Sequence, residues 1–328
     1  MKKYDIVGIG NPLMDFITKV DDEILAEFDL KKGIAHVVEQ EDIIKFSKIL
    51  GHHFYSMPGG SAANTIIAAS MLGLNTALMG SIGDDSLGNK YLSKLKSAGV
   101  TPLMRRVKGV TGSCMSLVTP DKERTMATFP GASMYFSKRH LNLKAIHDSG
   151  ILHIEGYQLL VANEREAAIN AMIEAKKSDT MVSFDFADPF LVRRHKDEIR
   201  HIVNNFADII FANEDEARLF TGKDVSGSVK ELSKKAKFVA VKLGKKGSVV
   251  ASGMLVEKIP VFKVNAVDTT GAGDIYATGF LYGIAKKKPL DVCGKIASFM
   301  AAKIVAQYGA YFEYPIKKEL RKLIKTSL

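Results

Sequence analysis

Short apolar runs recur along the chain and alternate with longer stretches of helical periodicity. Apolar runs of this length, bounded by turn residues, are typical of buried strands. The expected strands lie at 6–9, 76–79, 150–154, 181–184, 208–211, 238–241 and 248–250. Helical patterns lie between many of them, for example at 164–177 and 214–221. Strands that alternate with helices predict an α/β fold, in which a mostly parallel sheet is covered by helices on both faces.

Two regions depart from this alternation. Residues 14–38 and 101–129 read as strands and turns without long helices. We expect them to form a small discontinuous unit beside a large α/β unit made of 1–13, 39–100 and 130–328, and we do not expect the small unit to fold alone. Ligands of parallel sheets gather at the carboxyl ends of the strands, so polar motifs that follow strands are the candidates for a site.

The segment 268–274, DTTGAGD, places two glycines against a carboxylate just before an apolar helical run at 275–285. Glycines let successive backbone N–H groups converge on one point, and the start of a helix adds donors and partial positive charge, so this turn is suited to an anion. Asp274 would repel a bound phosphate. Its expected role is therefore to accept a proton from an alcohol while the turn stabilises the transferring group. An ordinary helix start with an acidic first turn is the alternative.

A second glycine pair, Gly59-Gly60, precedes Ser61 and Asn64 and another apolar helical run, and the first strand leads into 10–15, GNPLMD. On these residues the chain resembles the ribokinase-like (PfkB) family of carbohydrate and nucleoside kinases. The signatures of that family are G-G-x-x-x-N near the N-terminus and D-T-x-G-A-G-D near the C-terminus. The resemblance covers about residues 4–312.

The resemblance implies a ribokinase-like three-layer sandwich in which the small unit is a β-sheet lid over the acceptor. It also implies ATP and Mg²⁺ as cofactors. The segments 10–15, 121–131 and 213–216 are similar to the adenosine kinase branch. By the same resemblance Arg124 approaches the transferred phosphate, with a lone surface arginine as the alternative. The residues expected to carry the reaction are Asp274, Gly271, Ala272, Gly273 and Arg124.

The acceptor site is expected around Asp15, whose carboxylate can accept hydrogen bonds from two neighbouring sugar hydroxyls. In the family the matching aspartate does this together with residues that match Gly60 and Asn64, and a turn-forming aspartate is the alternative. An aromatic residue near Tyr157 stacks on the purine in adenosine kinases, and a core tyrosine is the alternative. The residues expected to bind the acceptor are Asn11, Leu13, Asp15, Gly59, Gly60, Ser61, Asn64, Met126 and Tyr157.

The donor site is implied by other matches to the family. Asn213 and Glu216 match an N-x-x-E element that organises magnesium and phosphates through water, although an asparagine cap on a helix explains the same residues. Lys242 stands where a small hydroxyl residue is common, so it either contacts a phosphate or points to solvent. The nucleotide is expected to contact Asn213, Glu216, Lys242, Gly244, Gly247 and Thr269. Asp268 and Thr270 match a loop that binds a monovalent cation such as K⁺ in some relatives.

Composition narrows the remaining possibilities. The 328 residues are 46% hydrophobic and contain no run as long as the ~20 apolar residues of a membrane span, so a cytoplasmic protein with a full core is expected. Cys114 and Cys293 predict neither a disulfide nor a zinc site, and the adjacent His52 and His53 are expected on a loop or the surface. The net charge of +10 comes from scattered lysines without a nucleic-acid motif, so we expect no nucleic-acid partner.

Three functions compete on the sequence. The leading one is an ATP-dependent nucleoside kinase that phosphorylates adenosine, and its rival is a sugar kinase of the same fold that acts on ribose, fructose or a keto-sugar. An apolar slot around Tyr157 would favour the purine, whereas additional polar groups would favour a sugar. A non-catalytic nucleotide-binding regulator is the third, and the complete glycine turn with Asp274 argues against it. A monomer and a homodimer both remain open.

Overall fold

The computed structural model describes residues 2–51, 55–121 and 123–327. His52 and His53, expected on a loop or the surface, lie outside the described residues. Within the described chain the largest sheet has nine strands. In spatial order they are β14 (Leu255–Ile259), β13 (Ser248–Ser252), β12 (Phe238–Lys242), β11 (Ile209–Asn213), β10 (Met181–Asp185), β9 (Ser149–Glu155), β1 (Tyr4–Ile9), β5 (Thr76–Gly83) and β6 (Thr101–Val107).

The pairing in this sheet is parallel from β6 to β12 and antiparallel for β13 and β14. The predicted mostly parallel α/β fold is therefore confirmed. The two antiparallel strands come last because β12, β13 and β14 follow one another through tight turns, and such turns can join only antiparallel strands.

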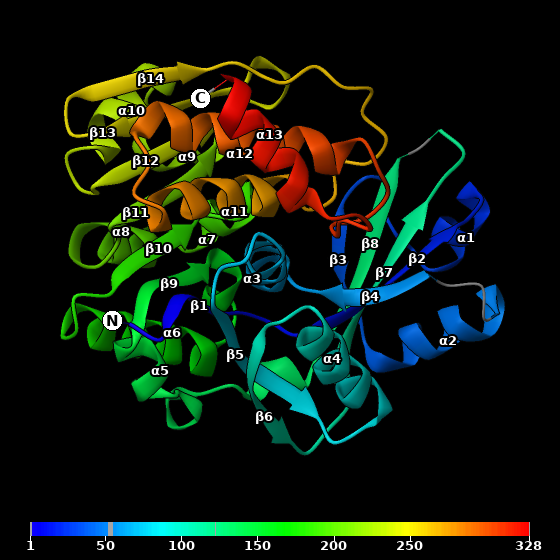
Figure 1. Cartoon of the computed structure of the whole chain (residues 1–328). Coiled ribbons are helices and arrows are strands. Elements are labelled where there is room, and N and C mark those ends of the chain that lie inside the picture. The colour runs from blue at the N-terminus through cyan, green and yellow to red at the C-terminus, as the bar shows by residue number, and fades with distance from the viewer. Residues whose placement is uncertain (1, 52–54, 122, 328) are drawn as a thin grey trace.

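Helices cover both faces of the large sheet (Figure 1). One face carries α3 (Ser61–Met71), α4 (Ser86–Ser97), α11 (Ala272–Ala285), α12 (Leu290–Val305) and α13 (Ile316–Ser327). The other carries α5 (Leu143–His147), α6 (Ala162–Lys176), α7 (Pro189–Arg194), α8 (Lys196–Asn205), α9 (Glu214–Thr221) and α10 (Val225–Leu232). Four short 3-10 turns are η1 (Ala132–Tyr135), η2 (Lys138–His140), η3 (Gly156–Leu159) and η4 (Gly244–Lys246) among the described residues.

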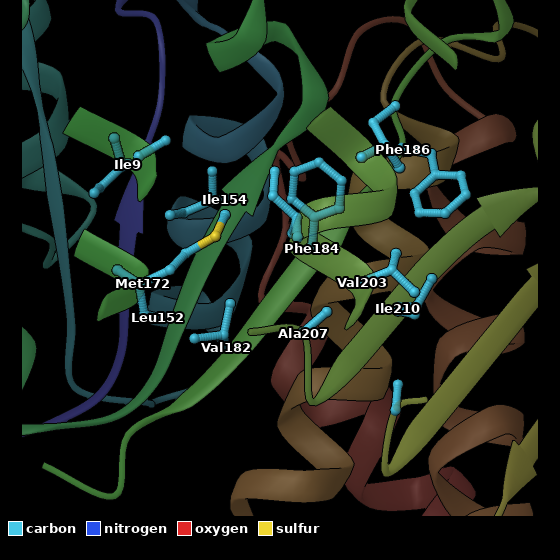
Figure 2. Packing of buried hydrophobic residues seen from close by; sticks show 14 of the residues in the cluster. Ile9, Leu152, Ile154, Met172, Val182, Phe184, Phe186, Val203, Ala207 and Ile210 are labelled. Carbon is cyan, nitrogen blue, oxygen red and sulfur yellow. The ribbon is translucent and has the colours of Figure 1, made fainter. Parts of the chain in front are cut away.

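Side chains of the strands alternate between two cores because successive residues point to opposite faces. Val7 and Ile9 of β1 pack on the side of α6, whereas Ile6 packs on the side of α3. Figure 2 shows part of the first core, where Met172 of α6 lies against the strands near Ile154. Burial on both faces explains why the sequence shows near-continuous apolar runs here.

A second sheet lies beside the large one, with α1 (Asp22–Glu27) and α2 (Gln40–Leu50) on its outer side (Figure 1). Its strands, in spatial order, are β3 (Ala35–Val37), β8 (Arg124–Gly131), β7 (Thr111–Val118), β2 (Leu13–Lys19) and β4 (Tyr55–Gly59). Met115, Leu117 and Ala127 point outward into a small core around Phe46 of α2. The opposite face carries Cys114, whose sulfur accepts a hydrogen bond of 3.2 Å from Thr128.

The predicted boundary of the small unit differs from the structure in three places. Residues 40–50, assigned to the large unit, form α2, which packs on the small sheet. Residues 101–107 form β6 and pair with β5 in the large sheet, although we assigned them to the small unit. Tyr55–Gly59, assigned to the large unit, pairs with β2 in the small sheet. Both strands lie at an edge of their sheets, so one side is exposed and their sequences lack the apolar signal that marks central strands.

The described chain passes between the two sheets four times. Residues 10–12 link β1 to β2, Gly60 links β4 to α3, residues 108–110 link β6 to β7, and Gly131 ends β8. Gly60 and Gly131 have positive φ angles, of 98° and 55°, which side chains with a Cβ rarely adopt. Because β1 enters the small sheet directly, that sheet begins at the carboxyl edge of the large one.

The close contact of α11 with α12 yields a stability prediction. A Cβ at Gly279 would lie 2.7 Å from the Cα of Ala297, which is backbone and cannot rotate away. Alanine ordinarily favours a helix over glycine by ~1 kcal/mol, but overpacking here should cost about 1 to 3 kcal/mol. We expect Gly279→Ala to lower the urea midpoint of unfolding, and a raised midpoint would show that the helices separate freely.

Candidate active site

Polar and charged residues end five neighbouring parallel strands on one edge of the large sheet. Strands β9, β10, β11 and β12 end at Glu155, Asp185, Asn213 and Lys242, and Asn11 follows the end of β1. The register places Asp185 beside Glu155, and Asn213 beside Lys242. The expected location of the site at the carboxyl edge of the sheet thus holds a dense set of polar groups.

The two glycine motifs, far apart in the sequence, meet at this edge. Gly271 adopts a left-handed conformation with φ of 70° and begins α11, which places Asp274 in the first turn. One carboxylate oxygen of Asp274 accepts a hydrogen bond of 2.7 Å from the Ser61 hydroxyl, and the other accepts one of 2.8 Å from the Asn64 amide. Ser61 and Asn64 belong to the first turn of α3, so the carboxylate joins the starts of two helices.

The surroundings of Asp274 keep it basic. Burial raises the pKa of its carboxyl group, hydrogen bonds from Asn64 and Ser61 oppose this, the Asp185 charge reinforces it and the Lys242 charge opposes it. A buried carboxylate with a raised pKa accepts a proton more readily than an exposed one. The arrangement suits a general base.

Asp15 projects from β2 directly over the glycine pair. A Cβ at Gly59 would lie 2.0 Å from a carboxylate oxygen of Asp15, and one at Gly60 would lie 2.2 Å from the carbonyl oxygen of Asn11. Gly60, whose φ is 98°, therefore requires glycine, and a side chain at position 59 would displace the Asp15 carboxylate. Burial raises the pKa of Asp15 to about 7, the Arg124 charge opposes the shift, and the Asp274 charge adds to it. The structure thus brings Asp15, Asp274 and the glycine pair together.

The other candidate residues of the small sheet lie on strands β8 and β2. Arg124 begins β8 on the face of the small sheet that carries Asp15. Its charge opposes the raised pKa of Asp15 and helps to lower the pKa of Asp268. Met126 is two residues further along β8 and shares the face of Arg124. Leu13 is partly buried and pairs with Gly59.

Asn213 and Glu216 cap α9 together. The Asn213 side-chain oxygen accepts from the Glu216 backbone N–H at 2.8 Å, and the Glu216 carboxylate accepts from the backbone and side-chain nitrogens of Asn213, both at 2.7 Å. The capping interpretation of this segment is therefore confirmed. Glu216 is only 1% exposed, and burial raises its pKa while the Lys242 charge opposes the shift.

Lys242 points into the site, which contradicts the alternative that it points to solvent. Its ammonium nitrogen lies 3.0 Å from a carboxylate oxygen of Asp185, and its side chain is 18% exposed. Burial opposes the charge on Lys242, but Asp185 and Glu216 raise its pKa above the ordinary value. The ammonium group would lie 3.2 Å from a Cβ at Gly273, so it adjoins the glycine turn.

Asp268 organises the loop that precedes this turn. One of its oxygens accepts from the Thr270 backbone N–H at 2.8 Å and from the Thr270 hydroxyl at 2.5 Å, and the other accepts from the Gly309 N–H at 2.9 Å. Burial opposes ionisation of Asp268, yet these hydrogen bonds lower its pKa. Thr269 is exposed, and its carbonyl oxygen accepts from the Ala272 N–H.

Gly244 and Gly247 form the turn after β12. Both have positive φ, of 56° and 89°, and a Cβ at Gly247 would lie 2.1 Å from the carbonyl oxygen of Ile259. The backbone conformation therefore explains these two glycines.

Sequence reasoning missed several buried groups below the acceptor site. Glu155 accepts a hydrogen bond of 2.9 Å from the Ala62 N–H, and the Gln158 amide donates one of 2.6 Å to the Asn11 side chain. Burial raises the pKa of Glu155 and that of Glu164, each to about 8. The Glu155 charge also raises the pKa of Glu164. Asp185 and Glu155 follow apolar runs directly, so their position at a strand end was the available signal.

Tyr157 is the second residue of η3, two positions after Glu155, and is neither fully buried nor exposed. Burial raises the pKa of its hydroxyl, as do the charges of Asp188, Glu155 and Asp274. Its contact with a purine stays a prediction.

Among the described residues, no group of three or more His, Cys, Asp and Glu side chains is arranged to hold a metal ion. None of the described helices is both long and apolar enough to cross a membrane.

The layered sheet with its second, smaller sheet and the carboxylate set at a glycine turn define a small-molecule kinase of ribokinase-like fold. Residues 28–317 match the model of the pfkB family of carbohydrate kinases, and the chain belongs to that family. Membership implies ATP as the phosphoryl donor.

Relatives of known or assigned activity span nearly the whole chain. Adenosine kinase from Saccharomyces cerevisiae is 28% identical over 342 residues, which cover 95% of this chain and 97% of the relative. The crystal structure of adenosine kinase from Sinorhizobium meliloti superposes with a TM-score of 0.90 at 29% identity, covering 98% and 99% of the two chains. A probable sugar kinase from Rhizobium etli CFN 42 superposes with a TM-score of 0.92 at 26% identity, with the same coverage.

The buried Glu155 carboxyl predicts a specific pH dependence of stability. The pKa of Glu155 is raised in the folded state, so the unfolded state loses this proton at a lower pH than the folded state does. The stability that the protonated carboxyl group contributes is therefore lost as pH rises from about 4.5 to about 8. Glu155→Gln keeps the shape without a titrating proton. We expect the variant to gain at least ~1 kcal/mol relative to wild type between pH 5 and pH 9, measured by urea unfolding.

The exposed Glu166 supplies a matched control, because Glu166→Gln removes a carboxylate from the surface and should give no such pH-dependent gain. Parallel stability curves for wild type and Glu155→Gln would show that Glu155 is ionised in the folded protein at neutral pH.

Proposed function

We propose that this protein is an ATP-dependent phosphotransferase that phosphorylates a ribose-type hydroxymethyl group, with adenosine as the favoured acceptor and AMP as the product. The observation that carries the proposal is the meeting of Asp274 with the starts of α3 and α11, beside Asp15. One carboxylate is suited to take a proton and the other to hold a diol, and the glycine turn between them is suited to an anion.

The proposed step is a direct in-line transfer. Asp274 accepts the proton of the acceptor hydroxyl as its oxygen forms a bond to the terminal phosphorus of ATP, and the bond between that phosphorus and the ADP oxygen breaks. The backbone N–H groups of Gly271, Ala272 and Gly273 stabilise charge on the transferring group. Ser61 and Asn64 hold Asp274 in place, because each donates to one of its oxygens. No covalent phosphoenzyme forms in this scheme.

Cationic groups of the chain would support the donor phosphates. Lys242 stands beside Gly273 and is held by Asp185, so its ammonium group can approach a phosphate at the turn. Arg124 approaches from the small sheet, near Asp15 and Asp268. Asn213, Gly244, Gly247 and Thr269 are proposed contacts for the nucleotide on the outer side of the turn.

The residues present fit magnesium only through water. Glu216 and Asp185 offer the oxygen ligands that Mg²⁺ prefers, but Asn213 and Lys242 already engage both carboxylates. Glu216 and Asn213 would therefore hold the magnesium ion through the water molecules of the ion's hydration shell. A bound magnesium ion would neutralise charge on the phosphates. Asp268 and Thr270 remain the proposed residues for a monovalent cation, K⁺.

Adenosine is proposed as the acceptor because two of the relatives described above are adenosine kinases that align over nearly the whole chain. In this proposal Tyr157 and Met126 contact the purine, Arg124 closes over the phosphate, and the small sheet acts as the lid. Asp15, with the backbone of Gly60, holds the ribose diol.

A free sugar is the second candidate, and a specific observation favours it. Gln158 and Glu164 are buried beside the partly buried Asn11, and one side-chain oxygen of each has no hydrogen-bond partner among the described residues. Polar groups of this kind suit additional sugar hydroxyls. The probable sugar kinase from Rhizobium etli has the same fold over 98% of this chain.

Removal of the proposed base is the first test. Asp274→Asn keeps the hydrogen-bonding shape but cannot take the proton, so turnover should fall ~10²- to 10⁴-fold while nucleotide binding stays close to wild type. Steady-state ADP release and nucleotide titration measure the two effects. Asp215→Asn, an exposed carboxylate in the first turn of α9, is the matched control. Near-normal turnover of Asp274→Asn would remove this residue from the mechanism.

An acceptor panel is the decisive experiment for the substrate. We expect ADP release with adenosine, and much less with guanosine, ribose, fructose or 2-keto-3-deoxygluconate. Tyr157→Ala should weaken adenosine binding by about 1 to 3 kcal/mol, by analogy with aromatic–base stacking, and leave turnover of a free sugar nearly unchanged. Tyr135→Ala, at an exposed tyrosine, serves as control. Efficient sugar phosphorylation without adenosine turnover would establish the second candidate instead.

A further inference from the structure

Three neighbouring strands of the large sheet bring two carboxylates and one ammonium group together at the edge where the site lies. β11 lies between β10 and β12 (Figure 1), and the side chains of Asp185 and Lys242 meet across its end. Asn213, the last residue of β11, pairs in register with Lys242, and Glu216 follows in the first turn of α9. The cation beside these carboxylates is therefore a lysine of the chain itself.

Each of the four carboxylate oxygens in this group has a donor. The Lys242 ammonium nitrogen lies 3.0 Å from one oxygen of Asp185 and 3.4 Å from the other, which also accepts from the Ala187 N–H at 3.0 Å. The two oxygens of Glu216 accept from the side-chain and backbone nitrogens of Asn213, both at 2.7 Å. Neither carboxylate is left as an open ligand for an ion from solution.

The backbone that holds Asp185 is strained. Ala187 has a φ of 70°, in the left-handed region that a residue with a Cβ adopts at a cost, and its N–H donates to Asp185. Strain of this kind persists where the surrounding structure requires it, and it is concentrated at functional sites. The fold thus accepts unfavourable backbone geometry next to the carboxylate that contacts Lys242.

The other side of the ammonium group faces the glycine turn. A Cβ at Gly273 would lie 3.2 Å from the Lys242 nitrogen, which is the one contact within 4 Å that the described residues outside the helix backbone would make with it. Burial opposes the charge on Lys242, but the charges of Asp185 and Glu216 raise its pKa, so the group stays ionised. A fixed positive charge thus stands between Asp185 and the place where the turn would hold a phosphate.

This position sets the ammonium group against a free metal ion. Magnesium is commonly held by one or two carboxylates together with the phosphates of a substrate. A cation that already contacts Asp185 repels a second cation from the same carboxylate, whereas a phosphate attracts it. The lysine therefore opposes an ion that arrives alone, but it favours a phosphate that brings its own ion.

We propose that Lys242 is the counter-ion of Asp185 in the nucleotide-free protein and keeps free divalent ions out of the site, so that magnesium enters only with the donor nucleotide. The arriving phosphates attract the ammonium group to the glycine turn, and the Asp185 carboxylate becomes available to the hydrated ion that they carry. This role rests on the proposed function, because it requires a nucleotide at the turn.

The test is a titration of the nucleotide-free protein with Mn²⁺ alone, an ion that binds the same oxygen ligands as Mg²⁺ and whose free form is measured by electron paramagnetic resonance. Lys242→Met keeps an unbranched side chain without the charge. We expect this variant to bind Mn²⁺ at least ~10-fold more tightly than wild type, because the repulsion is removed. Addition of Asp185→Asn to the same variant should abolish the gain.

Lys176→Met is the matched control. Lys176 contacts Asp208 at 2.7 Å, and the other oxygen of Asp208 accepts from the Val182 N–H at 2.8 Å, so the pair resembles that of Lys242 and Asp185. Asp208 precedes β11, however, and so lies at the opposite edge of the sheet. This variant should bind Mn²⁺ no more tightly than wild type.

Equal Mn²⁺ affinity in wild type and folded Lys242→Met would overturn the inference, as would a gain that survives Asp185→Asn. If Lys242→Met fails to fold, the nucleotide-free wild type decides. Mn²⁺ binding to wild type that Asp185→Asn abolishes would contradict exclusion by the lysine, and the absence of such binding would support it. The titration needs no turnover, so a lack of ADP release with every acceptor would refute the proposed function separately.

Discussion

The Asp274 carboxylate is half-buried where the first turns of α3 and α11 meet, and the geometry of the site depends on the hydrogen bonds that hold it there. A charge that loses part of its hydration is tolerated only when hydrogen bonds replace the lost water, and Ser61 and Asn64 provide them. The same two helices are joined further along, where the Thr65 hydroxyl donates to the Asp274 carbonyl and the Thr278 hydroxyl donates to the Thr65 carbonyl. The carboxylate thus sets the position of one helix against the other, and with it the position of the glycine pair that supports Asp15.

The ionisable groups of the site differ in kind from those that give the chain its net charge of +10. The buried groups at the strand ends and helix starts are mainly carboxyl groups, among them Asp185, Glu155 and Glu216, and burial raises the pKa of the two glutamates. Lys242 is paired within this group, and Arg124 faces it from the small sheet. A donor phosphate entering here must therefore bring cations with it or rely on backbone N–H groups, and the overall charge says nothing about the site.

The sequence was most informative where a local rule applies. Buried strands show continuous apolar runs and a glycine turn before a helix has few other uses, so the parallel sheet and the vicinity of Asp274 could be predicted. The edge strands β4 and β6 could not, because half-exposed strands carry weak patterns. Asp185 and Glu155 were missed for a different reason: their side chains contact residues distant in the chain, Lys242 and Ala62. The direction of Lys242 likewise depends on Asp185, 57 residues away, and only the fold brings the two together.

The order of strands in the small sheet has a consequence for how the chain is made. Strand β2 pairs with β4 on one side and in parallel with β7 on the other, and β7 leaves the ribosome only after β5, α4 and β6 of the large sheet have been synthesised. Long-range parallel pairing is intrinsically slow. A nascent chain that has completed β4 therefore presents an open edge of β2 until β7 arrives, and an open edge of this kind can pair with another chain.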